Sequence, residues 1–213
     1  MRTDDLIDML STNVERMDTR RINRNLKIAL VSGLILALVG GVAALGVRWD
    51  IQKPGVFLFL IFKLGFGAII VILGYYYLLK HARPGGETRS WTSLTAVPFI
   101  AIMALAAVSL SSAPSSHWER IMVGQNWLDC LLSIPIIAVL PFSAIMWAVR
   151  KAAPTHLIRT GALVGLVAGG ISAMAYALHC TDDTLPFVAF WYSGTIVLCT
   201  LAGALIGPRL LRW

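Results

Sequence analysis

Six long apolar runs dominate this chain and constrain its fold more than any other feature. Each run is about 20 residues long, the length that an α-helix needs to cross the hydrocarbon core of a membrane. The runs cover residues 28–47, 56–79, 92–112, 127–148, 160–178 and 187–207. Short loops join them, so little of the chain remains to fold outside a bilayer. We therefore expect an all-α integral membrane protein with six transmembrane helices in a bundle over residues 28–208.

The composition fits a membrane protein and argues against a soluble domain. Of the 213 residues, 57% are hydrophobic and only 14% are charged, whereas soluble domains carry about 25% charged residues. The net charge of +7 would suggest nucleic-acid binding in a soluble chain. Here the positive charges cluster between the apolar runs, as they do in the cytoplasmic loops of membrane proteins. We expect the lipid bilayer as a partner and no direct contact with nucleic acid.

The distribution of lysine and arginine predicts the orientation of the helices. Fourteen of these residues lie in the N-terminal tail, in loops 80–91 and 149–159, and in the short C-terminus 209–213, which would all share one side. The opposite side has only Arg48, Lys53 and Arg120. Because positively charged segments stay in the cytoplasm, we expect both termini to be cytoplasmic.

The N-terminal tail, residues 1–27, is the one sizeable segment before the apolar runs. Its apolar residues recur at helical spacing on an otherwise polar segment, which predicts a short amphipathic helix. The apolar stripe of this helix contains Leu6, Ile7, Leu10 and Val14. Such a stripe can dock into a groove of a soluble partner. The alternative is an interfacial helix followed by a basic stop signal, since five cations between Arg16 and Lys27 precede the membrane.

Two cysteines occupy matching positions at the outward ends of predicted helices. Cys130 begins the fourth segment and Cys180 follows the fifth. The polar residues close to them in the sequence are Asp129, His179, Asp182 and Asp183. The two thiols could form a disulfide, bind a soft metal with these groups or with His117, or serve only in packing.

Other residues within the apolar runs predict packing. Lys63 is the one charge inside a segment, and we expect a structural role in which its ammonium reaches the outer surface near Asp129. Cys199 is expected to be a small packing residue. Glycines at every fourth position predict close helix contacts, within one chain or between two; they are Gly161, Gly165 and Gly169 in the fifth segment and Gly203 and Gly207 in the sixth. Pro98, Pro135 and Pro141 are expected to kink their segments.

The sequence offers little for catalysis or transport. It contains no C-x-x-C pair, P-loop or G-x-S-x-G motif, and its membrane midplane is almost wholly apolar, unlike that of a transporter. We expect no enzymatic activity, no cofactor and no small-molecule substrate. The alternative is a small thiol-dependent membrane redox enzyme or metal-handling protein that uses the same two cysteines.

Several stretches of the chain match the pattern of a known family. They are MRTDDLI at 1–7, CLLSIPI at 130–136, RKAAPT at 150–155, YALHCTDDTLPFVAFWY at 176–192 and LIGPRLLRW at 205–213. On these stretches the chain resembles the NrsF-type (negative regulator of sigma-F) membrane anti-sigma factors, from end to end and most densely after residue 125.

The resemblance implies a regulator at the bacterial inner membrane. Members are taken to hold an extracytoplasmic-function sigma factor inactive and to release it under stress, with a pair of cysteines matching Cys130 and Cys180 implicated in sensing oxidants or heavy metals. The tail stripe would then dock the sigma factor, and the basic loops could add contacts to an acidic sigma surface. We expect a change at the cysteines to alter the packing of the fourth and fifth helices and to reach the tail along the glycine faces.

Overall fold

Six helices in the described part of the chain are long and apolar enough to cross a membrane, as the sequence predicts. The structure is a computed structural model that describes residues 19–81, 92–152 and 154–212. The long helices are α2 (Thr19–Leu45), α3 (Pro54–His81), α4 (Val97–Ser111, preceded by the 3₁₀ turn η1, Thr92–Ala96), α6 (Trp127–Arg150), α7 (Leu157–Ala177) and α9 (Ser193–Leu210). Their length and composition support a membrane protein.

Short elements fill one end of the bundle. These are the 3₁₀ turn η2 (Ser115–His117), α5 (Trp118–Val123), α8 (Leu185–Phe187) and η3 (Val188–Tyr192). The last of these is a π-helical turn, continuous with α8 and α9. A π-helical turn inside a longer helix is rare and often marks a functional site.

The helix boundaries differ from the predicted ones mainly at the first span. Helix α2 begins at Thr19, well before residue 28, because the basic residues that follow Thr19 are good helix formers and continue the helix. Pro98 lies in the first turn of α4, where a missing N–H costs little, and not in a helix interior as expected. Pro135 and Pro141 do lie inside α6.

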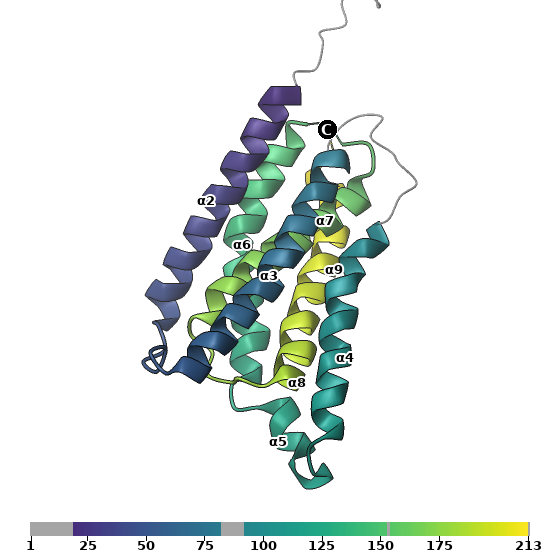
Figure 1. Ribbon diagram of the computed structural model, residues 1–213. Helices are drawn as coiled ribbons and strands as arrows, with labels where there is room; N and C mark the ends of the chain where they lie inside the picture. Colours follow the sequence, from purple (N-terminus) through teal and green to yellow (C-terminus); the bar gives the residue numbers. More distant parts are fainter. Residues whose placement is uncertain (1–18, 82–91, 153, 213) are drawn as a thin grey trace, which may run out of the picture.

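Helix α7 forms the centre of the bundle and is the most buried of the six. It packs against α2, α3, α6 and α9, whereas α4 lies at the edge and packs mainly against the short elements. The start of α2 and the C-terminus lie at the same end of the bundle, which we call the terminal end (Figure 1). We call the opposite end, which holds α5, α8 and the loop after α7, the cysteine end. The start of α2 and the end of α9 therefore share one side of the bundle, while the cytoplasmic location of the termini remains a prediction.

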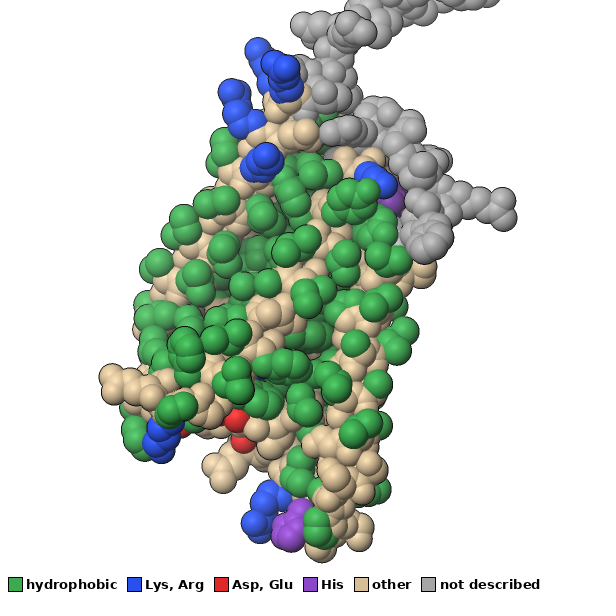
Figure 2. Space-filling model, viewed as in Figure 1, with side chains coloured by type: hydrophobic (Ala, Val, Ile, Leu, Met, Phe, Trp, Pro, Cys, Tyr) green, Lys and Arg blue, Asp and Glu red, His purple; other side chains and the backbone are tan. Residues whose placement is uncertain are grey.

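Hydrophobic side chains cover the middle of the bundle, as Figure 2 shows for one face. Large apolar residues are exposed on the outer helices, among them Val39, Ile72 and Leu205. Lysine and arginine gather at the start of α2 (Figure 2). An apolar belt of this kind would be costly in water and is suited to lipid.

Glycines bring α7 and α9 into close contact. A Cβ atom on Gly161 or Gly165 would collide with the backbone of α9, and one on Gly203 would collide with the backbone of α7. The predicted glycine faces therefore pair within one chain. Cys199 is buried at this contact, where its Cβ lies 3.0 Å from the position of a Cβ on Gly169, in agreement with the packing role expected for it.

Candidate functional site

The loop between α7 and α8, residues 178–184, organises the cysteine end. Helix α7 closes with two backbone bonds, because the amides of His179 and Cys180 both donate to the Tyr176 carbonyl, at 2.9 and 3.1 Å. Cys180 is fully buried directly after this closure. Two residues further on, the side chains of Asp182 and Asp183 bind two different parts of the chain.

Asp183 holds two buried cations that come from other elements. Its Oδ1 accepts a hydrogen bond from Lys63 Nζ at 2.7 Å, and its two oxygens accept from Arg48 Nη1 and Nη2 at 3.0 and 2.8 Å. Arg48 also donates to both oxygens of Asp50, at 2.6 and 3.0 Å. The side chains of Arg48 and Lys63 are only 2% and 0% exposed. Two cations and two carboxylates compensate each other, which makes the burial of these charges tolerable.

The same two cations bind the main chain at the cysteine. The Cys180 carbonyl accepts from Arg48 Nη1 at 2.8 Å and from Lys63 Nζ at 3.3 Å. We call the four charged side chains together with this carbonyl the Arg48 cluster. It joins the segment after α2, the first part of α3 and the loop after α7.

Three pKa shifts follow from this arrangement at the cysteine end. The hydrogen bond with Asp50 is the main cause that raises the pKa of Arg48, and the same bond lowers the pKa of Asp50 below its usual 3.8. Burial raises the pKa of the Cys180 thiol, an effect that the nearby Lys63 ammonium partly offsets. At neutral pH Arg48 and Asp50 are therefore ionised and Cys180 is a thiol.

Asp182 binds the turn between α5 and α6. Its carboxylate accepts from the backbone amides of Gln125, at 3.1 and 3.2 Å, and of Asn126, at 2.8 Å. Gly124 in this turn has φ 63°, and a Cβ there would lie 2.7 Å from the Phe187 ring and 2.9 Å from Asp182 Cγ. Only glycine fits this conformation and this space without strain.

Three further bonds fasten the α5–α6 segment to the region after α7. Asn126 Nδ2 donates to Thr181 Oγ1 at 2.9 Å, and Thr184 Oγ1 donates to the Ile121 carbonyl at 3.0 Å. Trp191 in the π-helical turn donates from its ring to the Met122 carbonyl at 2.9 Å. These bonds fix the first turn of α6, and therefore Cys130, against the loop that carries Cys180.

Cys130 and Cys180 are free thiols, and both are fully buried. They lie close enough to interact electrostatically, with Tyr176 and Tyr192 in the same environment. The two tyrosine rings are 6.0 Å apart, and the buried Tyr192 hydroxyl lies beside the Cys180 thiol. Two neighbouring reduced sulfurs can be oxidised to a disulfide or can bind a soft metal ion as thiolates.

The other predicted site residues divide into those that join the site and those that do not. Asp182 and Asp183 hold the loop as described, and the His179 ring lies 6.0 Å from the Tyr176 ring. Asp129 is exposed and takes no part in the ion pairs of the described chain. No group of three or more potential metal ligands occurs among the described residues. The docking residues Leu6, Ile7, Leu10 and Val14 lie outside the described residues, as does most of loop 80–91.

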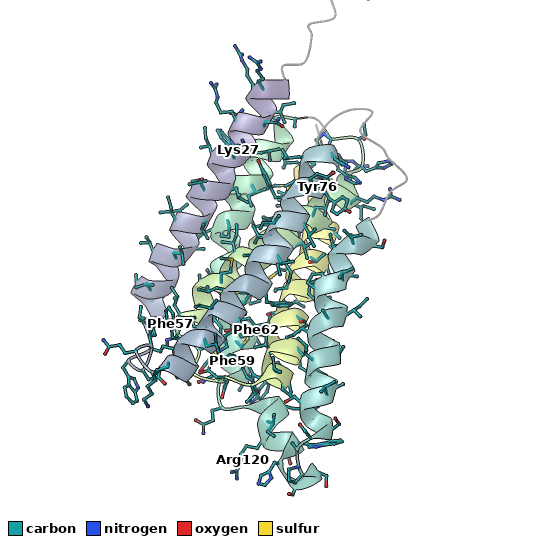
Figure 3. All side chains as sticks on the ribbon, in the orientation of Figure 1. Lys27, Phe57, Phe59, Phe62, Tyr76 and Arg120 are labelled. Carbon is teal, nitrogen blue, oxygen red and sulfur yellow. The ribbon has the colours of Figure 1, made fainter. Side chains whose placement is uncertain are left out.

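The prediction for Lys63 was wrong in its partner and its exposure. Its ammonium does not reach the surface near Asp129; it is buried on Asp183 and also lies 5.4 Å from the centre of the Phe59 ring. Figure 3 shows Phe59 with Phe57 and Phe62 on the part of α3 nearest the cysteine end. The reason is that the loop after α7 covers this part of α3. Sequence reasoning missed Arg48 and Asp50, which carry no signal beyond their charge.

Comparisons with known proteins place the chain in a family. A family model described as NrsF, negative regulator of sigma F, matches residues 10–213. The chain belongs to this family. The probable anti-sigma-F factor NrsF of Azospira oryzae is 29% identical over 213 residues, and the anti-sigma-F factor NrsF of Caulobacter vibrioides is 32% identical over 221 residues. Both matches cover 100% of each chain, and no solved structure matches.

The family assignment confirms the resemblance drawn from the sequence motifs. The relatives are named as anti-sigma factors, which are regulators and not enzymes. The expectation that this family member is not an enzyme is therefore confirmed, and the redox-enzyme alternative is set aside.

Proposed function

We propose that this family member is an anti-sigma factor of the bacterial inner membrane that sequesters an extracytoplasmic-function sigma factor through its cytoplasmic N-terminal tail. It releases the sigma factor when Cys130 and Cys180 react with an oxidant or with a soft heavy-metal ion. The family, the six apolar helices and the buried pair of thiols support this proposal.

The observation that carries the sensing step is the bonding of the Cys180 main chain. Its carbonyl accepts hydrogen bonds from two buried cations that belong to other elements. Forming a disulfide or a metal bond at the sulfur moves the residue, and any such movement changes both bonds. Hydrogen bonds to charged groups contribute about 1.5–3 kcal/mol each. Weakening two of them supplies the several kcal/mol that are needed to shift a two-state equilibrium.

Helix α2 supplies the connection from the cysteines to the tail. It directly follows residues 1–18, and Arg48 comes just after its other end. The Arg48 amide donates to the Leu178 carbonyl at 3.0 Å, so the backbone of this segment is bonded to the cysteine loop. A helix of 27 residues is about 40 Å long and transmits a displacement as a rigid rod.

Helix α2 also contacts the helix that begins with the other cysteine. Gly33 packs closely on Pro141 of α6, and Gly41 packs beside Ile137 of α6 and Ala175 of α7. The glycine faces expected to carry the signal instead join α7 to α9. We therefore propose α2, and not the glycine faces, as the route from Cys130 and Cys180 to the tail.

The docking role of the tail is tested by capture of the source organism's sigma factors on the full-length protein. The compared forms are the wild type, a chain that lacks residues 1–18, and Leu6→Glu/Leu10→Glu. The control is Thr12→Glu/Thr19→Glu, which adds the same charge on the face opposite the predicted stripe. We expect the wild type and the control to capture one sigma factor and the other two forms to lose it. Capture that survives the deletion would place the contact elsewhere.

The sensing role is tested with single cysteine variants and a reporter of sigma-dependent transcription. Cys130→Ser and Cys180→Ser should each abolish induction by a thiol oxidant or a soft metal, while Cys199→Ser should respond like the wild type. Reversal by a reductant or by a chelator identifies which of the two stimuli acts. A normal response of both single variants would mean that these thiols serve only in packing.

A further inference from the structure

The terminal end of the bundle has an open pocket between the start of α7 and the end of α9. Its volume is about 600 Å³, within the range of small-ligand sites. Arg159 enters from the first turn of α7, and Arg209 and Arg212 enter from the last turn of α9 and the residues after it. Both helix ends lie at the same end of the bundle as the start of α2 (Figure 1).

The charge of this pocket is uncompensated within the described residues. The three arginine side chains are exposed and form no ion pair there. The carboxylates of the described chain all belong to the cysteine end; they are Asp50, Glu119, Asp129, Asp182 and Asp183. Three guanidinium groups around one pocket therefore call for an anion from outside the described chain. Guanidinium groups match phosphate oxygens with paired hydrogen bonds.

The start of α7 adds to the positive field. His156 precedes the helix without a side-chain cap, and no acidic residue occupies the first turn. A helix N-terminus carries about half a positive charge, and Arg159 adds a cation where an anion is usually favoured. A bound phosphate would compensate both the helix N-terminus and the Arg159 cation. Unfavourable local arrangements of this kind occur most often at functional sites.

The walls of the pocket distinguish a lipid from a free ion. Leu157, Ile158 and Pro208 also line it, and Ile158 is 63% exposed. An inorganic phosphate gains nothing from apolar walls, whereas the glycerol and upper acyl carbons of a phospholipid do. The pocket also lies at the ends of two membrane-length helices, where headgroups are found, and basic pockets between membrane helices bind anionic headgroups.

We propose that this pocket binds the headgroup phosphate of an anionic phospholipid, through Arg159, Arg209 and Arg212. The inference rests on the membrane placement proposed above, but not on the sigma factor or on the cysteines. A lipid held there bridges the first turn of α7 and the end of α9, and so strengthens the contact made by the glycine faces at the terminal end.

The test measures binding of phosphatidylglycerol to delipidated full-length protein in detergent by native mass spectrometry. The pocket variant is Arg159→Gln/Arg209→Gln/Arg212→Gln. The matched variant, Arg24→Gln/Lys27→Gln/Arg150→Gln, removes three exposed cations from the same end but outside the pocket; Lys27 is labelled in Figure 3. Each cation that contacts the headgroup contributes about a factor of five in the affinity for anionic lipid, so the loss of three should weaken binding by the pocket variant about 100-fold. The matched variant should bind like the wild type.

Several outcomes would overturn the proposal. Equal binding of phosphatidylglycerol by the two triple variants would exclude the pocket. If the wild type binds zwitterionic phosphatidylcholine as tightly as phosphatidylglycerol, the negative charge of the lipid does not determine binding. If inorganic phosphate at the same concentration as the lipid displaces it, the pocket is a site for a soluble anion. If the pocket variant does not fold, Arg212→Gln alone replaces it, with an expected loss of about 5-fold. Failure of the wild type to enter phospholipid nanodiscs would instead contradict the membrane placement itself.

Discussion

Asp183 is the residue whose replacement tests the Arg48 cluster most directly. Its carboxylate accepts three charge-assisted hydrogen bonds and is the one carboxylate that contacts the buried Lys63 among the described residues. In Asp183→Asn the shape is kept but the charge is lost, so Asp50, which pairs with Arg48, is the one carboxylate that remains in the cluster. Lys63 is left without a counter-ion in a position where its side chain is 0% exposed.

The cost follows from the burial of the ammonium. Removing one partner of a buried ion pair typically costs about 3–5 kcal/mol. The value here should lie near the lower limit, about 3 kcal/mol, since Asp183 is itself 20% exposed and Arg48 keeps Asp50. The free energy of unfolding is measured by titration with a denaturing detergent in mixed micelles, and labelling of the buried thiols reports unfolding. The control, Asp129→Asn, removes an exposed carboxylate from the same end and should change the free energy by less than about 0.5 kcal/mol.

A double variant isolates the cause. In Lys63→Met/Asp183→Asn the uncompensated ammonium is absent, so the loss should be smaller than the sum of the two single losses by more than about 1 kcal/mol. If the effects simply add, or if Asp183→Asn costs no more than Asp129→Asn, the buried ion pair does not stabilise the cysteine end as described.

Glycine substitutions and pH provide independent tests of the fold. Gly124→Ala should lower the free energy of unfolding by about 2 kcal/mol or more, because left-handed strain of about 1 kcal/mol adds to the collisions of the new methyl group. Gly46→Ala, at φ 76° in open space, should lower it only by the cost of the strain. Equal losses in the two variants would contradict the tight contact at Gly124. Gly165→Ala should lower the free energy of unfolding by about 1–3 kcal/mol, because the new methyl group separates α7 from α9. Gly65→Ala, with nothing within 4 Å of the new methyl group, should leave the stability unchanged or raise it by up to about 1 kcal/mol. Thermal melts of the two variants measure the difference. Since a neighbouring guanidinium lowers the pKa of Asp50 below 3.8, the stability from this pair is present at higher pH and is lost as the pH falls through the lowered pKa. The difference in melting temperature between the wild type and Asp50→Asn should therefore stay constant between about pH 8 and 5 and disappear only below about pH 4.

The sequence was sufficient to predict the six membrane-length helices and the placement of Cys130 and Cys180 at the same end of the bundle. The length of each apolar run determines the helices. Because successive membrane helices alternate in direction, the position of each cysteine along the chain determines the end of the bundle at which it lies. The glycine spacing likewise predicted close packing, although it did not reveal that α7 and α9 are the partners. The intramolecular contact follows only from the three-dimensional arrangement.

The polar contacts of the cysteine end were not predictable in the same way. Lys63 required a carboxylate, but the outward loops offer several, and sequence distance does not rank Asp183 above Asp129. Arg48 looked like an ordinary loop cation, since nothing in its neighbours reveals that it is buried against a loop more than a hundred residues later. Such pairings depend on how separate loops fold over one another, which helical periodicity does not encode.

The π-helical turn at Val188–Tyr192 limits how this family can vary in length. A π turn contains one residue more than an α-helix would use for the same turn, so the helix absorbs that residue without a change in the rotational phase of α9. Within this turn, Trp191 bonds the α5–α6 segment; downstream, Gly203 and Gly207 must face α7. Deleting one residue between Tyr192 and Gly203, where the helix is already α-helical, would rotate everything that follows by about 100° and would turn the glycines away from their partner helix. Relatives are therefore expected to tolerate a one-residue change of length in their loops or at this turn more readily than inside α9.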